Sequence, residues 1–74
     1  MSDYEPINIQ QVVKIICANQ KITQKVLAKR HGDLYSTFKN KLNRNTMKFA
    51  EVERLMDELD CDIVFVDRKT KKVY

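Results

Sequence analysis

Five polar side chains between residues 35 and 43 have the types and spacing of a hydrogen-bonding surface: Tyr35, Ser36, Lys39, Asn40 and Asn43. In a helix, residues three and four positions apart lie on the same side, so these five would share one side. An asparagine amide both donates and accepts, a lysine ammonium donates, and a serine hydroxyl does either. Asparagine therefore suits the edge of adenine and lysine that of guanine. The alternative is an exposed face whose lysines serve solubility alone.

The charge of the chain is concentrated around this stretch. The protein of 74 residues carries a net charge of +4, but residues 14–50 hold nine basic side chains against Asp33 alone. Residues 51–62, by contrast, hold six acidic side chains against Arg54. A basic region attracts a polyanion and speeds its encounter, with an affinity that falls as salt rises. A solvated lysine-rich face is the ordinary alternative, and the coincidence with the polar stretch favours binding of a polyanion.

Two short helices joined at Gly32, the only glycine, are predicted to position these side chains. Thr23 is a good N-cap for a helix over residues 24–31, and Gly32 supplies the positive φ of a tight turn. Asp33 is the nearest cap for the next helix, expected over residues 34–42. The side of that helix expected to point inward holds Phe38, Leu42 and part of Leu34.

Two further helices complete the expected core. Asn8 can cap a helix over residues 9–18, after a frayed lead-in of residues 1–7. The last helix is expected over residues 49–59, although Lys48 stands where a capping hydroxyl is common. The apolar positions of these two helices are Ile9, Val12, Val13 and Ile16, then Phe49, Val52, Leu55, Met56 and Leu59.

The end of the chain changes period. Ile63, Val64, Phe65 and Val66 are apolar on both alternating faces, which suits a strand covered on both sides. A turn over residues 68–71 and a return over residues 72–74 complete a predicted β-hairpin over residues 61–74. The helices can cover one face, and we expect a partner subunit to cover the other, which makes these four residues a dimerisation element. In the alternative, the hairpin folds over the core of a monomer with one face half exposed.

Composition and cysteine use exclude several classes of protein. The 43% apolar and 32% charged residues are those of one globular domain over residues 1–74. No apolar run is long enough for a bilayer and the acidic start does not resemble a signal peptide, so we expect a cytoplasmic protein without a membrane partner. Cys17 and Cys61 lack metal-ligand spacing, so we expect two small buried hydrophobes and neither metal nor cofactor. An enzyme is the weakest hypothesis, because no nucleophile–base pair, carboxylate pair or glycine-rich phosphate loop is present.

The segment TQKVLAKRHG followed by STFKNKLNRN resembles the Xre and Cro-like helix-turn-helix repressors of bacteria and phages. In that family, a TQxxLA…G segment leads to S-T-hydrophobic-x-N-x-L-N. The tail VERLMDELDCDIVFVDRKTKKVY is similar to small members whose last helix is followed by a strand pair. The resemblance covers about residue 9 to the end. It implies a mainly α, four-helix, lambda repressor/Cro-like domain, with helices over residues 9–59 and a C-terminal β-hairpin over residues 61–74.

The resemblance also implies roles for single residues. Gln24, at the start of the second helix, would hydrogen-bond a DNA phosphate, and on the same hypothesis Lys25 strengthens binding to any DNA sequence. The residues implied at the major groove are Tyr35, Ser36, Lys39 and Asn40, and those implied at the backbone beyond it are Asn43 and Arg44. Tyr35 could instead only cover the turn.

Three places depart from the family pattern. The family often has Val or Ile after the glycine and then a Ser or Thr cap, whereas this chain has Asp33 and Leu34. The third helix could therefore start a residue early, and the charge of Asp33 would lie close to phosphates unless the carboxylate is used as the cap. His31 replaces an aliphatic residue, for which we expect a satisfied, partly buried imidazole, with a pH-sensitive contact as the alternative. Lys48 is the third departure.

These observations predict a sequence-specific, DNA-binding transcriptional repressor that reads a two-fold-related operator as a homodimer. The alternative keeps the fold but binds a protein, as a phage-encoded inhibitor or an antitoxin does, through the basic face or the acidic residues 51–62. Charge alone does not exclude RNA, although the stacking aromatics that an RNA-binding sheet would carry are absent from the exposed side.

Overall fold

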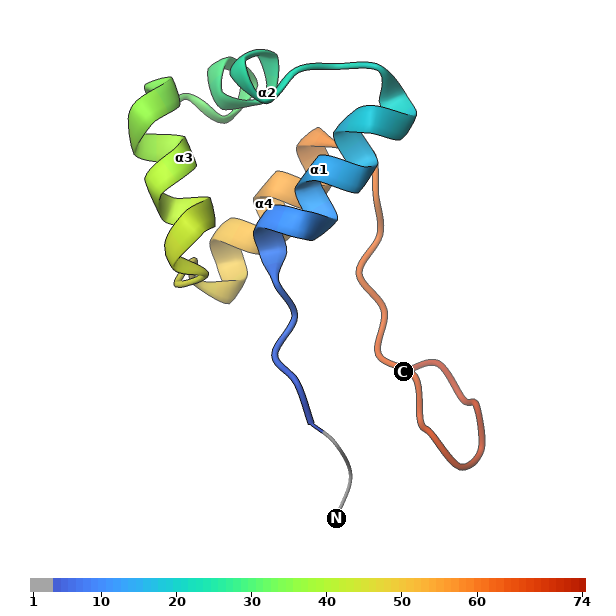
Figure 1. Cartoon of the computed structure of the whole chain (residues 1–74). Coiled ribbons are helices and arrows are strands. Elements are labelled where there is room, and N and C mark those ends of the chain that lie inside the picture. The colour runs from blue at the N-terminus through green and yellow to red at the C-terminus, as the bar shows by residue number, and fades with distance from the viewer. Residues whose placement is uncertain (1–3) are drawn as a thin grey trace.

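The computed structural model describes residues 4–74 and shows a mainly helical fold (Figure 1). Its helices, in chain order, are α1 (Ile9–Gln20), α2 (Gln24–His31), α3 (Tyr35–Arg44) and α4 (Phe49–Glu58). The first three residues of the predicted lead-in lie outside the described part of the chain. Among residues 4–74, no helix combines the length and the apolar character that crossing a bilayer requires.

The ends of α1 and α2 follow the predicted capping residues. The Asn8 side chain accepts a hydrogen bond from the Gln11 amide, and the Thr23 hydroxyl accepts one from the Val26 amide, each at 3.2 Å. The structure confirms α2 over Gln24–His31, with Gly32 at φ 85° as its left-handed C-cap. α1 runs further than predicted, because Lys21 takes the left-handed conformation that ends it.

The start of α3 differs from the prediction. The helix begins at Tyr35, and Leu34 is an N-cap residue whose side chain makes no capping hydrogen bond. Asp33 is not the cap, because its carboxylate accepts a hydrogen bond from Lys41 instead. Leu34 does not point inward: it is 76% exposed. The carboxylate that the local sequence offers as a cap is thus paired with Lys41, eight residues further along the chain.

The buried side chains of α3 and α4 set which side of each helix faces the core. Phe38 and Leu42 are buried as predicted, and α4 has the same start as predicted, with Lys48 at its N-cap. Phe49 was predicted inside but is 53% exposed. The apolar side chains that form the buried core are Ile9, Val13, Cys17, Leu27, Ala28, Phe38, Leu42, Leu55, Met56 and Leu59. Burying each large member contributes about 1.5–3 kcal/mol.

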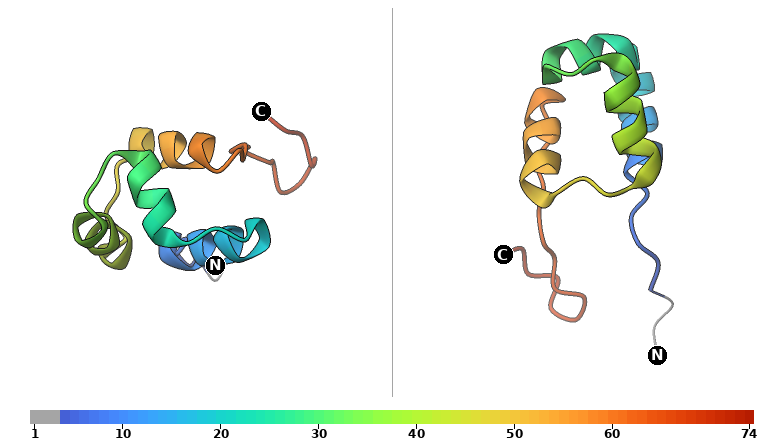
Figure 2. Two further views of the ribbon diagram at one scale, coloured as in Figure 1. Left: turned by 90° about the horizontal axis from the view of Figure 1, so that it is seen from above. Right: turned by 90° about the vertical axis from the view of Figure 1, so that its left-hand side faces the viewer.

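The four helices are held together mainly through α2. It packs against both α3 and α4, while α1 packs against α3. In the right-hand view of Figure 2, α3 and α4 stand on opposite sides beneath α2. The end of α1 is also tied to the end of α4, since the Gln20 side chain donates to the Leu59 carbonyl at 2.6 Å. The position of α3 relative to α4 therefore depends on contacts made around α2 and the turn after it.

The predicted C-terminal β-hairpin is not formed in the described chain. Val66 and Val73 make one isolated antiparallel bridge, and no strand is present among residues 4–74. The turn itself is present, because the Asp67 carboxylate accepts hydrogen bonds from the amides of Lys69 and Thr70 at 2.8 and 3.0 Å. A two-stranded hairpin is marginal in water without a packed face. Here Ile63, Val64, Phe65 and Val66 are 37–59% exposed, so neither face is fully covered.

Candidate nucleic-acid interface

The outward side of α3 carries the polar residues predicted for it. Tyr35, Ser36, Lys39 and Asn40 are all exposed, because Phe38 and Leu42 turn the opposite side of the helix into the core. These side chains offer a phenol, a hydroxyl, an ammonium and an amide in two turns of helix. Together they can donate to and accept from a polar surface along the length of α3.

The starts of α2 and α3 meet at one end of this surface. Lys25 Nζ lies 5.6 Å from the centroid of the Tyr35 ring, a cation–π contact between two residues of the predicted site. Gln24 is the first residue of α2 and is partly buried. The backbone N–H groups in the first turn of a helix favour an anion, so Gln24 and Lys25 stand where a phosphate can bind.

The other end of the surface is formed by the last turn of α3. Asn43 is exposed, but its side-chain oxygen accepts a hydrogen bond from the side-chain amide (Nε2) of Gln10 on α1, so part of its bonding capacity is used inside the protein. Arg44 is exposed and borders a small polar hollow. This hollow has a volume of about 300 Å³ and is lined by Thr37, Asn40, Lys41, Arg44 and Thr46. Its donors can hold an oxygen of an anionic group.

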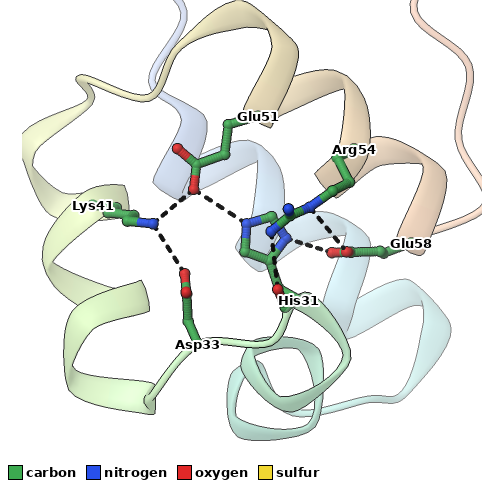
Figure 3. A network of polar contacts seen from close by, with 6 residues as sticks. All are labelled: His31, Asp33, Lys41, Glu51, Arg54 and Glu58. Carbon is green, nitrogen blue, oxygen red and sulfur yellow. Dashed lines mark hydrogen bonds and ion pairs between the residues drawn. The ribbon is translucent and has the colours of Figure 1, made fainter.

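Lys41 also lies on α3, and its ammonium points to the carboxylates of Asp33 and Glu51 (Figure 3). Nζ donates to Asp33 Oδ2 at 3.1 Å and to Glu51 Oε2 at 2.8 Å. The hydrogen bond from Lys41 holds the pKa of the Glu51 carboxyl below its usual range, although burial opposes this shift. The hydrogen bonds to Glu51 and then Asp33 raise the pKa of Lys41. This lysine therefore serves an internal ion pair.

His31, at the end of α2, is the buried centre of the same network. Its side chain is 0% exposed, with Nδ1 2.6 Å from Glu58 Oε1 and Nε2 3.2 Å from Glu51 Oε2. Arg54 donates to the His31 carbonyl at 2.9 Å. Each ring nitrogen thus has a carboxylate oxygen as its partner, and both partners come from α4. The prediction of a satisfied imidazole is confirmed, but the ring is fully rather than partly buried.

One group of possible metal ligands falls within this network. Ligand atoms of His31, Asp33 and Glu51 lie within 4.8 Å of one another. The Lys41 ammonium already bridges the two carboxylates, and the imidazole binds one of them. These ligand atoms are thus already engaged by other side chains of the protein, and we assign no metal to this group.

The predicted dimerisation residues lie on a separate apolar surface. Ile63, Val64 and Phe65 border a groove of about 620 Å³ that runs between the N-terminal lead-in and α4. The outward-facing ring of Phe49 lies beside that of Phe65, with 6.1 Å between the ring centroids. No backbone hydrogen bond between described residues involves 62–64, so their N–H and C=O groups are free to pair.

Three residues that lie near the interface were not assigned to it from the sequence. Leu34 and Thr37 are exposed beside the predicted reading residues, and Leu34 was assigned to the core because the helix was expected to include it. Asn45 ends α3 in the left-handed conformation, and its side chain accepts from the Ile9 amide at 3.0 Å and donates to the Ile7 carbonyl at 2.9 Å. Asparagine tolerates positive φ, and this property of Asn45 was the available signal.

Comparisons of the chain with protein-family models, with curated proteins and with solved structures gave no match.

Proposed function

We propose that this protein is a sequence-specific DNA-binding regulator of transcription that acts as a repressor in the cytoplasm. The observation that carries the proposal is the outward side of α3, where Tyr35, Ser36, Lys39 and Asn40 offer hydrogen bonds free of the core. The basic charge of residues 14–50 surrounds this side. The resemblance of the α2–α3 segment to Xre and Cro-like repressors supports the same function.

In the proposed complex, α3 lies in the major groove and the start of α2 rests on the DNA backbone. Asn40 and Lys39 lie in the middle of α3 and read bases, with Ser36 one turn earlier. Gln24 and Lys25 bind a phosphate at the start of α2, where the helix dipole adds to the attraction. Arg44 reaches the backbone from the other end of α3, so phosphate contacts flank the base contacts on both sides.

We further propose that two copies pair through the exposed segment that holds Ile63, Val64, Phe65 and Val66. The backbone groups of residues 62–64 are free, whereas the Phe65 carbonyl accepts from the Tyr74 amide at 2.9 Å. A second copy can pair with the free groups and cover the apolar side chains at once. Antiparallel pairing centred on Phe65 would set the acidic Asp62 opposite the partner's Arg68. A two-fold dimer of this kind reads two half-sites about one helical turn, roughly 34–36 Å, apart.

Selection of bound sequences from a random pool of DNA duplexes tests the proposal. The expected result is a consensus whose two halves are related by a two-fold axis, with weaker binding at higher salt. Failure of the purified protein to shift any duplex at low salt would overturn DNA binding. A consensus with one half only would retain DNA binding and overturn the dimer.

A second candidate is a protein-binding module, favoured by the exposed acidic side of α4 and the residues after it. Glu53, Asp57, Asp60 and Asp62 are exposed there and repel a polyanion. Under this candidate the chain binds a basic protein surface and the duplex selection yields no consensus. The test is capture from a nuclease-treated lysate. This candidate is supported if the wild-type chain repeatedly captures one basic protein that a double variant, Glu53→Lys with Asp57→Lys, does not capture.

A further inference from the structure

Lys41 stands apart from the other basic residue in the middle of α3. Lys39, two positions earlier, is exposed on the polar side, whereas the Lys41 ammonium lies between Asp33 and Glu51. We propose that Lys41 is a positioning residue: it sets the orientation of α3 on the body of the protein and does not bind DNA itself. The inference rests on the proposed function, because the proposed role of Lys41 is to fix the polar side of α3 in the orientation that binds DNA.

The two carboxylates that hold Lys41 come from different elements. Asp33 lies in the turn between α2 and α3, and Glu51 lies in the first turn of α4. An ammonium has three donors, and two of them are used in these bonds. If Lys41 turned toward a phosphate, two partly buried carboxylates would lose their cation. The position between the two carboxylates is therefore favoured over one at a phosphate, because it leaves both partly buried carboxylates paired.

Glu51 extends the link from α3 to α2. The same oxygen, Oε2, lies within hydrogen-bonding distance of Lys41 Nζ and of His31 Nε2 (Figure 3). The other nitrogen of His31 binds Glu58, about two helical turns further along α4. One carboxylate thus joins three helices. The closest helix packing is of α2 against α3 and of α2 against α4. The hydrogen bond between Glu51 and Lys41 adds a direct contact between α4 and α3.

The competing assignment makes Lys41 a phosphate ligand. Lys41 borders the polar hollow together with Arg44, so a freed ammonium would have an anion site within reach. The two assignments predict opposite effects of removing Glu51. If Glu51 positions α3 through Lys41, its loss weakens DNA binding. If Glu51 restrains a phosphate ligand, its loss releases that ligand and strengthens binding.

The test compares Glu51→Gln with Glu53→Gln in duplex binding at several salt concentrations. Glu53 is exposed on α4, so its substitution makes the same change in net charge without touching the network. Relative to this control, we expect Glu51→Gln to bind about two- to fivefold more weakly, the effect of losing one exposed or partly buried ion pair. The dependence of affinity on salt should match the control, because no phosphate contact is lost.

Further variants keep the test decisive if Glu51→Gln unfolds. Asp33→Asn removes the other carboxylate and should also weaken binding, whereas Lys41→Arg keeps a cation between the two carboxylates and should bind as the wild type does. Binding by Glu51→Gln or Asp33→Asn that equals or exceeds the Glu53→Gln control overturns the positioning role alone. A wild-type protein that binds no duplex overturns both this inference and the proposed function.

Discussion

Gly32→Ala is expected to destabilise the protein through its backbone alone. Gly32 has a φ of +85°, and a Cβ built on it would meet no atom within 4 Å. Steric crowding therefore adds nothing, and the cost is that of a left-handed backbone, about 1–2 kcal/mol for a residue with a Cβ. Alanine also restricts the unfolded chain, which offsets about 0.4–1 kcal/mol. We expect the free energy of unfolding to fall by about 1 kcal/mol.

Urea unfolding followed by far-ultraviolet circular dichroism measures this loss, because the signal comes from the four helices. The midpoint should fall while the m value stays constant, since the surface exposed on unfolding is the same. In a thermal scan, a loss of 1 kcal/mol corresponds to a fall in Tm of about 4–8 °C for a domain of this size.

Two variants at the same position separate backbone from packing. Gly32→Asn should lose less than Gly32→Ala, because asparagine tolerates positive φ. A D-alanine introduced at position 32 by chemical synthesis adopts positive φ readily and should be at least as stable as glycine. If the D-alanine protein is as unstable as Gly32→Ala, the space around the turn sets the requirement and the reasoning from φ is refuted.

Other substitutions test the interface, the ion pairs and the dimer. Asn40→Ala should weaken binding to the preferred sequence by about 1–3 kcal/mol, whereas Lys25→Ala should weaken binding to all duplexes and lower the salt slope by about 1, both measured by fluorescence anisotropy. Equal losses on every sequence for Asn40→Ala would contradict base reading. The pKa of Glu51 is lowered from 4.5 by Lys41, so its ion pair stabilises the fold above that pH and is lost as the pH falls below it. The stability of Glu51→Gln should therefore vary less with pH in this acidic range than that of the wild type, and an unchanged profile would remove the ion pair from the acid response. Val64→Lys should give a monomer in sedimentation equilibrium with unchanged helix content, and a persisting dimer would place the contact elsewhere.

Local capping chemistry allowed several boundaries to be predicted. Asn8, Thr23 and Gly32 act within four residues of their own position, so their roles follow from nearby sequence. The apolar spacing of Phe38 and Leu42 likewise predicted which side of α3 is buried, and hence which polar residues are exposed. The exposed positions of the candidate interface were thus predicted correctly, although their contact with DNA stays a prediction.

The start of α3 and the state of the C-terminal segment were not predictable in the same way. Asp33 is a good local cap, but the cations available to it depend on where Lys41 lies after the helices pack. The β-hairpin needed a packed face that the described chain does not supply. In both cases the local sequence favours one structure, and a contact made or missing elsewhere in the fold decides the outcome.

The sequence by itself determined the helices, the turn at Gly32 and the side of α3 that faces outward, because these depend on interactions over one or two turns. Only the tertiary structure decided that His31 binds Glu51 and Glu58, at separations of 20 and 27 residues, and that Lys41 is held inside this network. No periodicity marks such pairs. They form because packing of α2 against α3 and α4 brings these side chains within hydrogen-bonding distance, and a buried polar group needs such a partner.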